Sequence, residues 1–230
     1  MSKFKTKTIE NFLSDDEINT INQIMATTNP RYNKSGVEQA LGMHMADYWY
    51  MDLYENQRSP ENARHKEIAD ILLPRFQHHF HHDICIDDCH IIETVVPYSI
   101  HSDTLTPVPI EGNEEAWTII IPFDDFYSNT FIFEQRCPWT KSVQEWAAKE
   151  NPPKLNVISD DMYERYFTHC YRGDLEYLTI HDMFPWRKGW CNGTARSRFH
   201  CSDNYATRGL TTKRGIVAWT SLPIGSVTKK

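Results

Sequence analysis

Residues 90–103 read His-Ile-Ile-Glu-Thr-Val-Val-Pro-Tyr-Ser-Ile-His-Ser-Asp. The opening part, His90–Val96, consists mostly of β-branched side chains, which predicts a strand. Pro97 ends that run, and the chain then opens into a loop that carries His101 and Asp103. A histidine and a carboxylate two residues apart at a strand end can turn inward toward the same cation. This stretch therefore predicts a β-rich fold and a metal site at the end of one strand.

Short β-branched and aromatic runs continue after this stretch, separated by turn residues, as in a sandwich or barrel. The expected strands cover residues 117–123, 129–133, 177–180, 186–192 and 215–220. Two helix-like segments interrupt them, Lys141–Glu150 and Ser159–Phe167, and Ser159 is a plausible N-cap with acidic residues in the first turn. We expect this helical part, about 138–170, to be an insertion between strands.

The N-terminal part is expected to be helical, to about residue 84. A short strand-like segment, Lys7–Leu13, precedes Ser14 and Glu17, which have the spacing of a capping box at the start of a helix. A second helix is expected to start at Ser59, and Pro74 should kink or end it. With no repeat and no linker, residues 1–230 are interpreted as one α+β domain, mainly β, with N-terminal helices packed on an antiparallel β-structure.

Composition narrows the class of protein. The net charge of −7 and the scattered basic residues make nucleic acid an unlikely partner. No apolar run is long enough to span a membrane, and no signal peptide is recognisable, so we expect a cytoplasmic protein. The six cysteines contain no CxxC pair and are interpreted as reduced thiols.

A second histidine completes the metal hypothesis. His200 lies in the run Arg196–Ser202, far from His101 and Asp103 in the sequence. Two histidines and one carboxylate are the donor set that holds Fe(II) on one face and leaves the other positions open. A competing His-x-Asp, His81–Asp83, follows the second helix and is interpreted as a solvated helix end. His181 and Asp182 lack the intervening residue and are rejected as a metal motif.

The order of these parts resembles the Fe(II)/2-oxoglutarate-dependent dioxygenase superfamily. The opening Ile9–Ser14, with its capped helix, is similar to the entry of such domains. The Trp-x-Lys-Gly stretch at 186–189, the Arg-Ser-x-x-His-Cys-Ser run at 196–202 and the Lys-x-Gly strand at 213–215 resemble the prolyl-hydroxylase-like group of phages and marine bacteria. The resemblance covers residues 7–220, although only the metal motif and the final strand are specific.

The resemblance implies a double-stranded β-helix, a jelly roll closed around the metal. It implies that His101, Asp103 and His200 ligate iron, and that a basic residue early in the last strand pairs with the far carboxylate of 2-oxoglutarate. Lys213 and Arg214 both match that position. Lys213 is favoured because Gly215, two residues later, leaves room for the carboxylate, whereas arginine is the better bidentate partner.

Arg208 is a more distant third candidate for this carboxylate. Thr118 is expected to add a hydroxyl to the co-substrate.

The function implied is hydroxylation of an unidentified small molecule or peptide, with release of succinate and carbon dioxide. One alternative is a cupin-like metal enzyme that does not use 2-oxoglutarate, although the His-x-His and glutamate of cupins are absent. Another is a non-catalytic jelly-roll binding protein. Selectivity is expected to reside in the helical insertion and in the aromatic stretch Tyr48–Met51. That stretch lies within residues 29–58, which are interpreted as a loop or irregular strand region lying over a surface, with a lid as one role open to it. The oligomeric state is left open.

Overall fold

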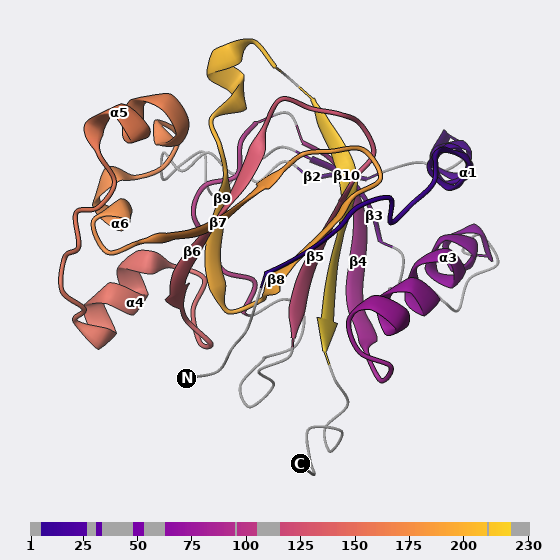
Figure 1. Cartoon of the computed structure of the whole chain (residues 1–230), viewed down its shortest axis with the longest axis horizontal. Coiled ribbons are helices and arrows are strands. Elements are labelled where there is room, and N and C mark those ends of the chain that lie inside the picture. Colours follow the sequence, from indigo (N-terminus) through magenta and orange to yellow (C-terminus); the bar gives the residue numbers. More distant parts are fainter. Residues whose placement is uncertain are drawn as a thin grey trace.

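The computed structural model describes residues 6–26, 31–33, 48–52, 63–94, 96–104, 116–210 and 212–221. These residues form two antiparallel β-sheets and a set of helices (Figure 1). The strands are β1 (Lys7–Ile9), β2 (Arg31–Asn33), β3 (Tyr48–Asp52), β4 (Cys85–Thr94), β5 (Trp117–Pro122), β6 (Asn129–Arg136), β7 (Ile180–Pro185), β8 (Cys191–Ala195), β9 (Arg198–Ser202) and β10 (Lys213–Ser221). The helical elements are α1 (Asp15–Ala26), α3 (Ala63–His79), α4 (Val143–Glu150), α5 (Asp160–Met162), the π-helical η2 (Tyr163–Phe167), α6 (Arg172–Leu175) and the 3-10 helix η3 (Tyr205–Arg208).

The larger sheet has seven strands in the order β1-β8-β5-β10-β4-β3-β2, and the smaller has the order β7-β6-β9. Strand β10 lies in the middle of the larger sheet, where Gly215 is paired with Ile92 of β4 on one side and Pro122 of β5 on the other. Most neighbours in the two sheets are strands that are not consecutive in the sequence, the exceptions being β2-β3, β3-β4 and β6-β7, so the sheets depend mainly on long-range pairing. The fold is mainly antiparallel β with helices, as expected.

Each sheet buries its outer face against helices, and a hydrophobic core lies between each sheet and the helices packed on it. Helices α1 and α3 cover the larger sheet, while the α4–α6 region lies beside the smaller one (Figure 1). Along β5 the alternation is clear, because Ile119 and Ile121 belong to the core under α1 and α3, whereas Thr118 points the other way. The same alternation places Phe199 in the second core and His200 on the opposite face of β9. Polar side chains therefore gather between the sheets.

The predicted capping box of α1 is present. Ser14 Oγ accepts from the backbone N–H of Glu17 at 3.3 Å, and the Glu17 carboxylate accepts from the backbone N–H of Ser14 at 2.8 Å. The predicted N-cap Ser159 likewise accepts from the N–H of Met162. The start expected at Ser59 lies outside the described residues, as does most of the 29–58 segment.

Pro74 does not end the second helix, since α3 continues to His79. Pro74 lies on the exposed face, where water can donate to the carbonyl oxygen that an N–H at this position would otherwise have bonded.

Two predicted strands are wrong. Residues 186–192 turn instead of extending, because Gly189 has φ +71° and a Cβ there would lie 2.5 Å from the carbonyl oxygen of Leu13. Residues 177–180 mostly continue the turns that end α6, through hydrogen bonds from the N–H groups of Tyr177 and Leu178 to the carbonyls three residues earlier. The strands β7 and β8 start later than predicted, and β9 was not predicted as a strand.

The strand predicted at His90–Val96 also differs in its bounds, because the strand observed there, β4, starts at Cys85 and ends at Thr94. Its pairing with β10 extends to Ser221, which draws the preceding acidic residues into the strand. The six cysteines are all free thiols, as predicted. None of the helices in the described ranges is long and apolar enough to cross a membrane.

Candidate metal centre

Three predicted metal-ligating side chains meet between the two sheets. His101 Nε2 lies 3.8 Å from Asp103 Oδ1, and His200 Nε2 lies 3.3 Å from Asp103 Oδ2. Their donor atoms all lie within 4.8 Å of one another. The exposed fraction of the side chain is 29% for His101, 8% for Asp103 and 6% for His200. The side chains of Asp103 and His200 are therefore buried, whereas that of His101 is partly accessible to solvent.

Backbone hydrogen bonds hold the two histidines together. The N–H of His101 donates to the carbonyl of His200 at 3.0 Å, and the N–H of His200 donates back at 2.8 Å. This isolated antiparallel bridge fastens the loop after β4 to the middle of β9. This pair of backbone hydrogen bonds brings His101 and His200, which are far apart in the sequence, next to each other.

Each imidazole is oriented by a second hydrogen bond. His101 Nδ1 lies 2.7 Å from the carbonyl oxygen of Ser99, and His200 Nδ1 lies 3.0 Å from that of Arg198. A carbonyl oxygen only accepts, so the proton of the neutral ring resides on Nδ1 in both cases. Both Nε2 lone pairs consequently face Asp103, which is the arrangement found in metal-ligating histidines.

The electrostatics of Asp103 and His101 also suit a cation, because the carboxyl is ionised and the ring is neutral. Burial opposes ionisation of Asp103, but His200, His101 and the Thr118 hydroxyl outweigh it and hold the pKa of this carboxyl well below its usual range. Burial and the neighbouring His200 lower the pKa of His101 to about 4, so that ring is neutral at pH 7. Burial also lowers the pKa of His200, but Asp103 more than compensates and raises it.

Thr118 contacts a predicted ligand. Its hydroxyl donates to Asp103 Oδ2 at 2.6 Å, a hydrogen bond within the buried space between the sheets. This hydrogen bond fixes the position of Asp103 Oδ2. The contact of Thr118 with a co-substrate stays a prediction, while its role in orienting Asp103 follows from the geometry.

Replacing Thr118 with valine is expected to lower the affinity for a divalent metal by roughly 10- to 100-fold, the usual cost of removing a hydrogen bond that orients a ligand. Metal titration of the purified variant measures the effect. Thr194→Val is a matched control, since Thr194 pairs directly with Thr118 across β5 and β8 and its buried hydroxyl has no partner in the described part of the chain. Equal metal affinity for Thr118→Val and Thr194→Val would contradict the assignment.

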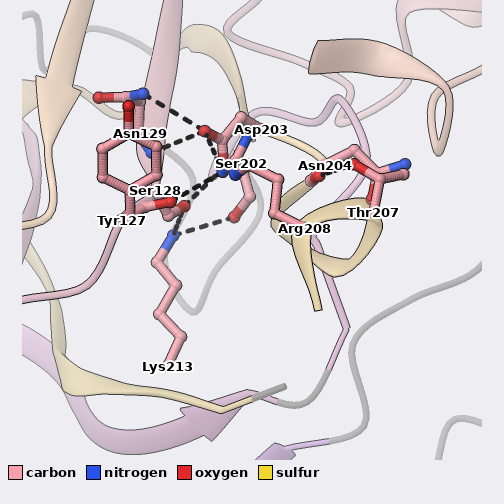
Figure 2. Close-up of polar contacts among 9 residues, drawn as sticks. All are labelled: Tyr127, Ser128, Asn129, Ser202, Asp203, Asn204, Thr207, Arg208 and Lys213. Carbon is pink, nitrogen blue, oxygen red and sulfur yellow. Dashed lines mark hydrogen bonds and ion pairs between the residues drawn. The ribbon is translucent and has the colours of Figure 1, made fainter. Parts of the chain in front are cut away.

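Lys213 lies in a cluster of polar side chains, which we call the Lys213 pocket, together with Ser202 and Ser128 (Figure 2). Its side chain is buried, and its Nζ donates to Ser202 Oγ at 3.2 Å and to Ser128 Oγ at 3.5 Å. The ring centroid of Trp186 lies 4.1 Å from Nζ, which adds a cation–π contact. No carboxylate of the described residues lies within ion-pair distance of this ammonium group.

The other two basic candidates lie elsewhere. Arg214 points away from Lys213, as alternation along β10 requires, and its guanidinium donates to Asn22 of α1 at 2.7 Å and lies near Glu93. Arg208 donates to Asp203 at 2.9 Å from the end of η3. Of the three, only Lys213 combines burial between the sheets with a charge that makes no ion pair to a described residue.

Several polar residues of this pocket were not predicted. Asp203 is fully buried and accepts from Ser128 Oγ at 2.6 Å and from the backbone N–H of Asn129 at 3.1 Å (Figure 2). Ser202 shares a face of β9 with His200, so a period of two from the predicted ligand would have identified it. Ser128 carries no such signal, because it precedes β6 in a loop.

The competing cluster His81–Asp83 directly follows α3, as expected of a helix end. Its three side chains also bring possible ligand atoms close together, and His82 Nε2 lies 3.1 Å from Asp83 Oδ2. The side chain of His82 is 80% exposed, however, and no strand or backbone carbonyl orients it within the described residues. The two clusters differ in burial and in the hydrogen bonds that fix their donor atoms.

Comparisons with known proteins give the fold class. No family model and no curated protein matches the sequence. Among solved structures, an oxidoreductase of the 2OG-Fe(II) oxygenase family from Burkholderia pseudomallei has a TM-score of 0.56 at 10% identity, over 94% of this chain and 85% of that chain.

The epimerase SnoN, solved with Fe3+, alpha ketoglutarate and nogalamycin RO, gives 0.53 at 13% identity over 95% and 79%. HygX from Streptomyces hygroscopicus, solved with nickel and 2-oxoglutarate, gives 0.52 at 12% identity over 96% and 84%. The chain therefore has the fold of the 2-oxoglutarate- and Fe(II)-dependent oxygenases.

Proposed function

We propose that this protein is a non-heme Fe(II), 2-oxoglutarate-dependent dioxygenase that hydroxylates a small molecule or peptide. One observation carries the proposal: His200 and Ser202 project from the same face of β9, so a metal donor set and a buried ammonium group lie side by side. Two residues along a strand span roughly 7 Å, the scale of a five-carbon dicarboxylate. One end of such a molecule would reach the metal and the other Lys213.

The donor set fits Fe(II). Two imidazole nitrogens with fixed tautomers and one ionised carboxylate supply three ligands, and this combination with open positions is typical of iron oxygenases. His101, Asp103 and His200 are the ligands in this proposal. The structures similar to this chain include one with iron and one with nickel, each together with the keto acid.

The Lys213 pocket fits the far carboxylate of 2-oxoglutarate. A buried ammonium ion without a carboxylate partner carries a desolvation cost that a bound anion offsets. The hydroxyl of Ser202 lies beside it as an additional donor, whereas the hydroxyl hydrogen of Ser128 is already donated to Asp203. Lys213, and not Arg214, is therefore the proposed partner of the co-substrate.

The architecture proposed for the whole chain follows from the same reading. The two sheets, with the site between their inner faces, are interpreted as the two halves of a jelly-roll barrel. We propose one oxygenase domain over residues 1–230, with an N-terminal helical part and a helical insertion between β6 and β7.

The chain's own residues have distinct roles in this mechanism. Asp103 and the two histidines hold the metal, Thr118 fixes the carboxylate, and Lys213 anchors and orients the keto acid. Iron with 2-oxoglutarate and oxygen supplies an oxidant for a substrate C–H bond, with release of succinate and carbon dioxide. The apolar walls of the two cores exclude water from the outer faces of the sheets.

The proposal is tested with protein loaded anaerobically with Fe(II). We expect binding of one 2-oxoglutarate per chain and release of succinate on exposure to oxygen. Retained metal without 2-oxoglutarate binding would instead favour a cupin-like enzyme, and absence of retained metal in elemental analysis would favour a non-catalytic protein.

The affinity for 2-oxoglutarate is expected to fall at alkaline pH. Burial lowers the pKa of Lys213 to about 8, and only the protonated amine attracts a carboxylate. Raising the pH through 8 removes this charge, so the affinity should be nearly constant near neutral pH and then fall by up to about tenfold per pH unit.

Titrations of 2-oxoglutarate between about pH 7 and 9.5 measure this profile. Lys213→Arg is the control, since its guanidinium keeps its charge and should give a flat profile even where the affinity itself changes. An identical alkaline decline in both proteins would rule out Lys213 as its source.

A further inference from the structure

A cavity of ≈ 470 Å³ shares wall residues with the Lys213 pocket but is not lined by Lys213. It is not lined by His101, Asp103 or His200 either, the three residues of the proposed metal triad. Ser128 and Trp186, which contact Lys213, also line this cavity. The remaining walls come from the loop between β5 and β6, the end of β7, η2 and the end of η3. The function proposed above leaves this pocket without a role.

The charge of the pocket is unusual for this chain. Three arginines line it, Arg165, Arg187 and Arg208, against a single carboxylate, Asp125. Asp125 Oδ1 already accepts from the backbone N–H of Lys188 at 3.1 Å. Since the whole protein carries a net charge of −7, this gathering of cations runs against the overall balance.

Two of these arginines have no acidic partner in the part of the chain that the structure describes. Arg165 and Arg187 are exposed and make no ion pair with any described residue, whereas Arg208 pairs with Asp203. Arg208 uses only Nη2 for its hydrogen bonds, to Asp203 and to the carbonyl of Tyr127 at 2.8 Å. Its Nη1 group makes none within the described part of the chain. Guanidinium groups with unused donors are the usual receptors of phosphate and carboxylate.

Aromatic rings accompany the charges. Tyr127 is 78% exposed, and the Arg208 guanidinium carbon lies 5.6 Å from the centroid of its ring. The guanidinium carbon of Arg165 lies 5.1 Å from the ring centroid of Tyr166, which also lines the pocket. An exposed large ring in a cavity offers a flat apolar surface to a planar ligand.

We propose that this pocket binds a small anion, a phosphate or carboxylate carried on a planar ring, and that its occupation weakens binding of the dicarboxylate at Lys213. The coupling rests on the proposed function. Arg208 Nη2 donates to Asp203, Ser128 Oγ donates to the same carboxylate, and Lys213 donates to Ser128 (Figure 2). An anion bound to Arg208 offsets the positive charge of that guanidinium group, which these contacts connect to Lys213. The dicarboxylate at Lys213 is then held less tightly.

The binding half is tested by titrating the purified protein, without iron or 2-oxoglutarate, with adenosine monophosphate, inorganic phosphate and adenosine at fixed ionic strength. We expect the two phosphates to bind, the nucleotide more tightly, and adenosine not to bind. Arg165→Gln combined with Arg187→Gln should weaken nucleotide binding by about tenfold or more, as expected for loss of charge-assisted hydrogen bonds.

Arg172→Gln is the control, because Arg172 is an exposed arginine placed 5.0 Å from the ring of Tyr163 but outside this pocket, although it differs from Arg165 and Arg187 in pairing with Asp160. Unchanged binding in the double variant, equal losses in the Arg172 control, or equal binding of adenosine would overturn the proposal.

The coupling half compares 2-oxoglutarate affinity with and without saturating nucleotide, and we expect the dissociation constant to rise about fivefold in wild type and not in the double variant.

Lys213→Ala separates the two pockets, since it should abolish dicarboxylate binding and leave nucleotide binding intact. Loss of both would place the nucleotide at the co-substrate site and overturn the inference. A protein that binds nucleotide but no 2-oxoglutarate would refute the proposed function and the coupling, and leave the anion pocket standing.

Discussion

Asp103→Ala is expected to abolish iron binding and turnover. The variant removes one of three proposed ligands, the one that lies between the two histidine Nε2 atoms. The loss in Fe(II) affinity should exceed the roughly 10- to 100-fold that removal of an outer hydrogen-bond partner costs. Anaerobic Fe(II) titration and assay of succinate release measure the two effects, and circular dichroism verifies that the variant is folded.

Asp83→Ala is the matched control for this experiment. It removes the carboxylate of the other histidine cluster, which follows α3 and is exposed to solvent. We expect its iron affinity and succinate release to equal those of the wild type. Unchanged activity in Asp103→Ala, or its loss in Asp83→Ala, would move the metal centre away from the space between the sheets.

Lys213→Ala is expected to weaken 2-oxoglutarate binding by about 30-fold to several thousand-fold. Truncating one partner of a buried, hydrogen-bonded charge pair costs roughly 2–5 kcal/mol, and the ammonium group of Lys213 is the buried cation of the pocket. Iron binding should persist, because no triad residue contacts Lys213. Titration of 2-oxoglutarate into metal-loaded protein measures the loss.

Arg214→Ala distinguishes the two basic residues that share the start of β10. Its guanidinium contacts Asn22, Glu93 and Asp124 on the side of α1, away from the site. We therefore expect 2-oxoglutarate affinity within about twofold of wild type and at most a small loss of stability, as is usual for partly exposed ion pairs. A larger loss of affinity in Arg214→Ala than in Lys213→Ala would reverse the assignment.

Much of the candidate metal centre was predictable because its signals are local. His101 and Asp103 occur two residues apart where a β-branched run ends, and His200 occurs in a separate run further along the chain. The N-caps of α1 and α5 were likewise predictable from nearby residues. In each, a serine hydroxyl accepts a hydrogen bond from the N–H three residues later, a contact that needs no distant part of the protein.

The strand bounds in the second half were less predictable. Residues 186–192 have the apolar and aromatic composition of a strand, yet the left-handed backbone of Gly189 and its close approach to Leu13 turn the chain there. Residues 198–202 contain Arg198 and His200, which mask a strand that pairs with β6 over a bulge. Composition describes what a segment prefers, while pairing with distant strands decides where it begins and ends.

The sequence by itself determined which residue types were available and which of them share a strand face. It placed Lys213 with Gly215 and Arg214 on the other face, because side chains alternate along any strand. Only the tertiary structure decided which of these faces lies on the side of the candidate metal centre, by packing Ile216 and Ala218 against the helical core and leaving Lys213 between the sheets.

The same holds for the contacts that orient the site. Thr118 reaches Asp103, and Ser128 connects Lys213 to Asp203, through hydrogen bonds that span different strands and loops. Their formation depends on register and on the packing of two sheets, which are long-range properties with no local signal. The physical reason is that periodicity fixes relative direction along one strand, whereas burial of two apolar faces fixes which direction becomes the interior.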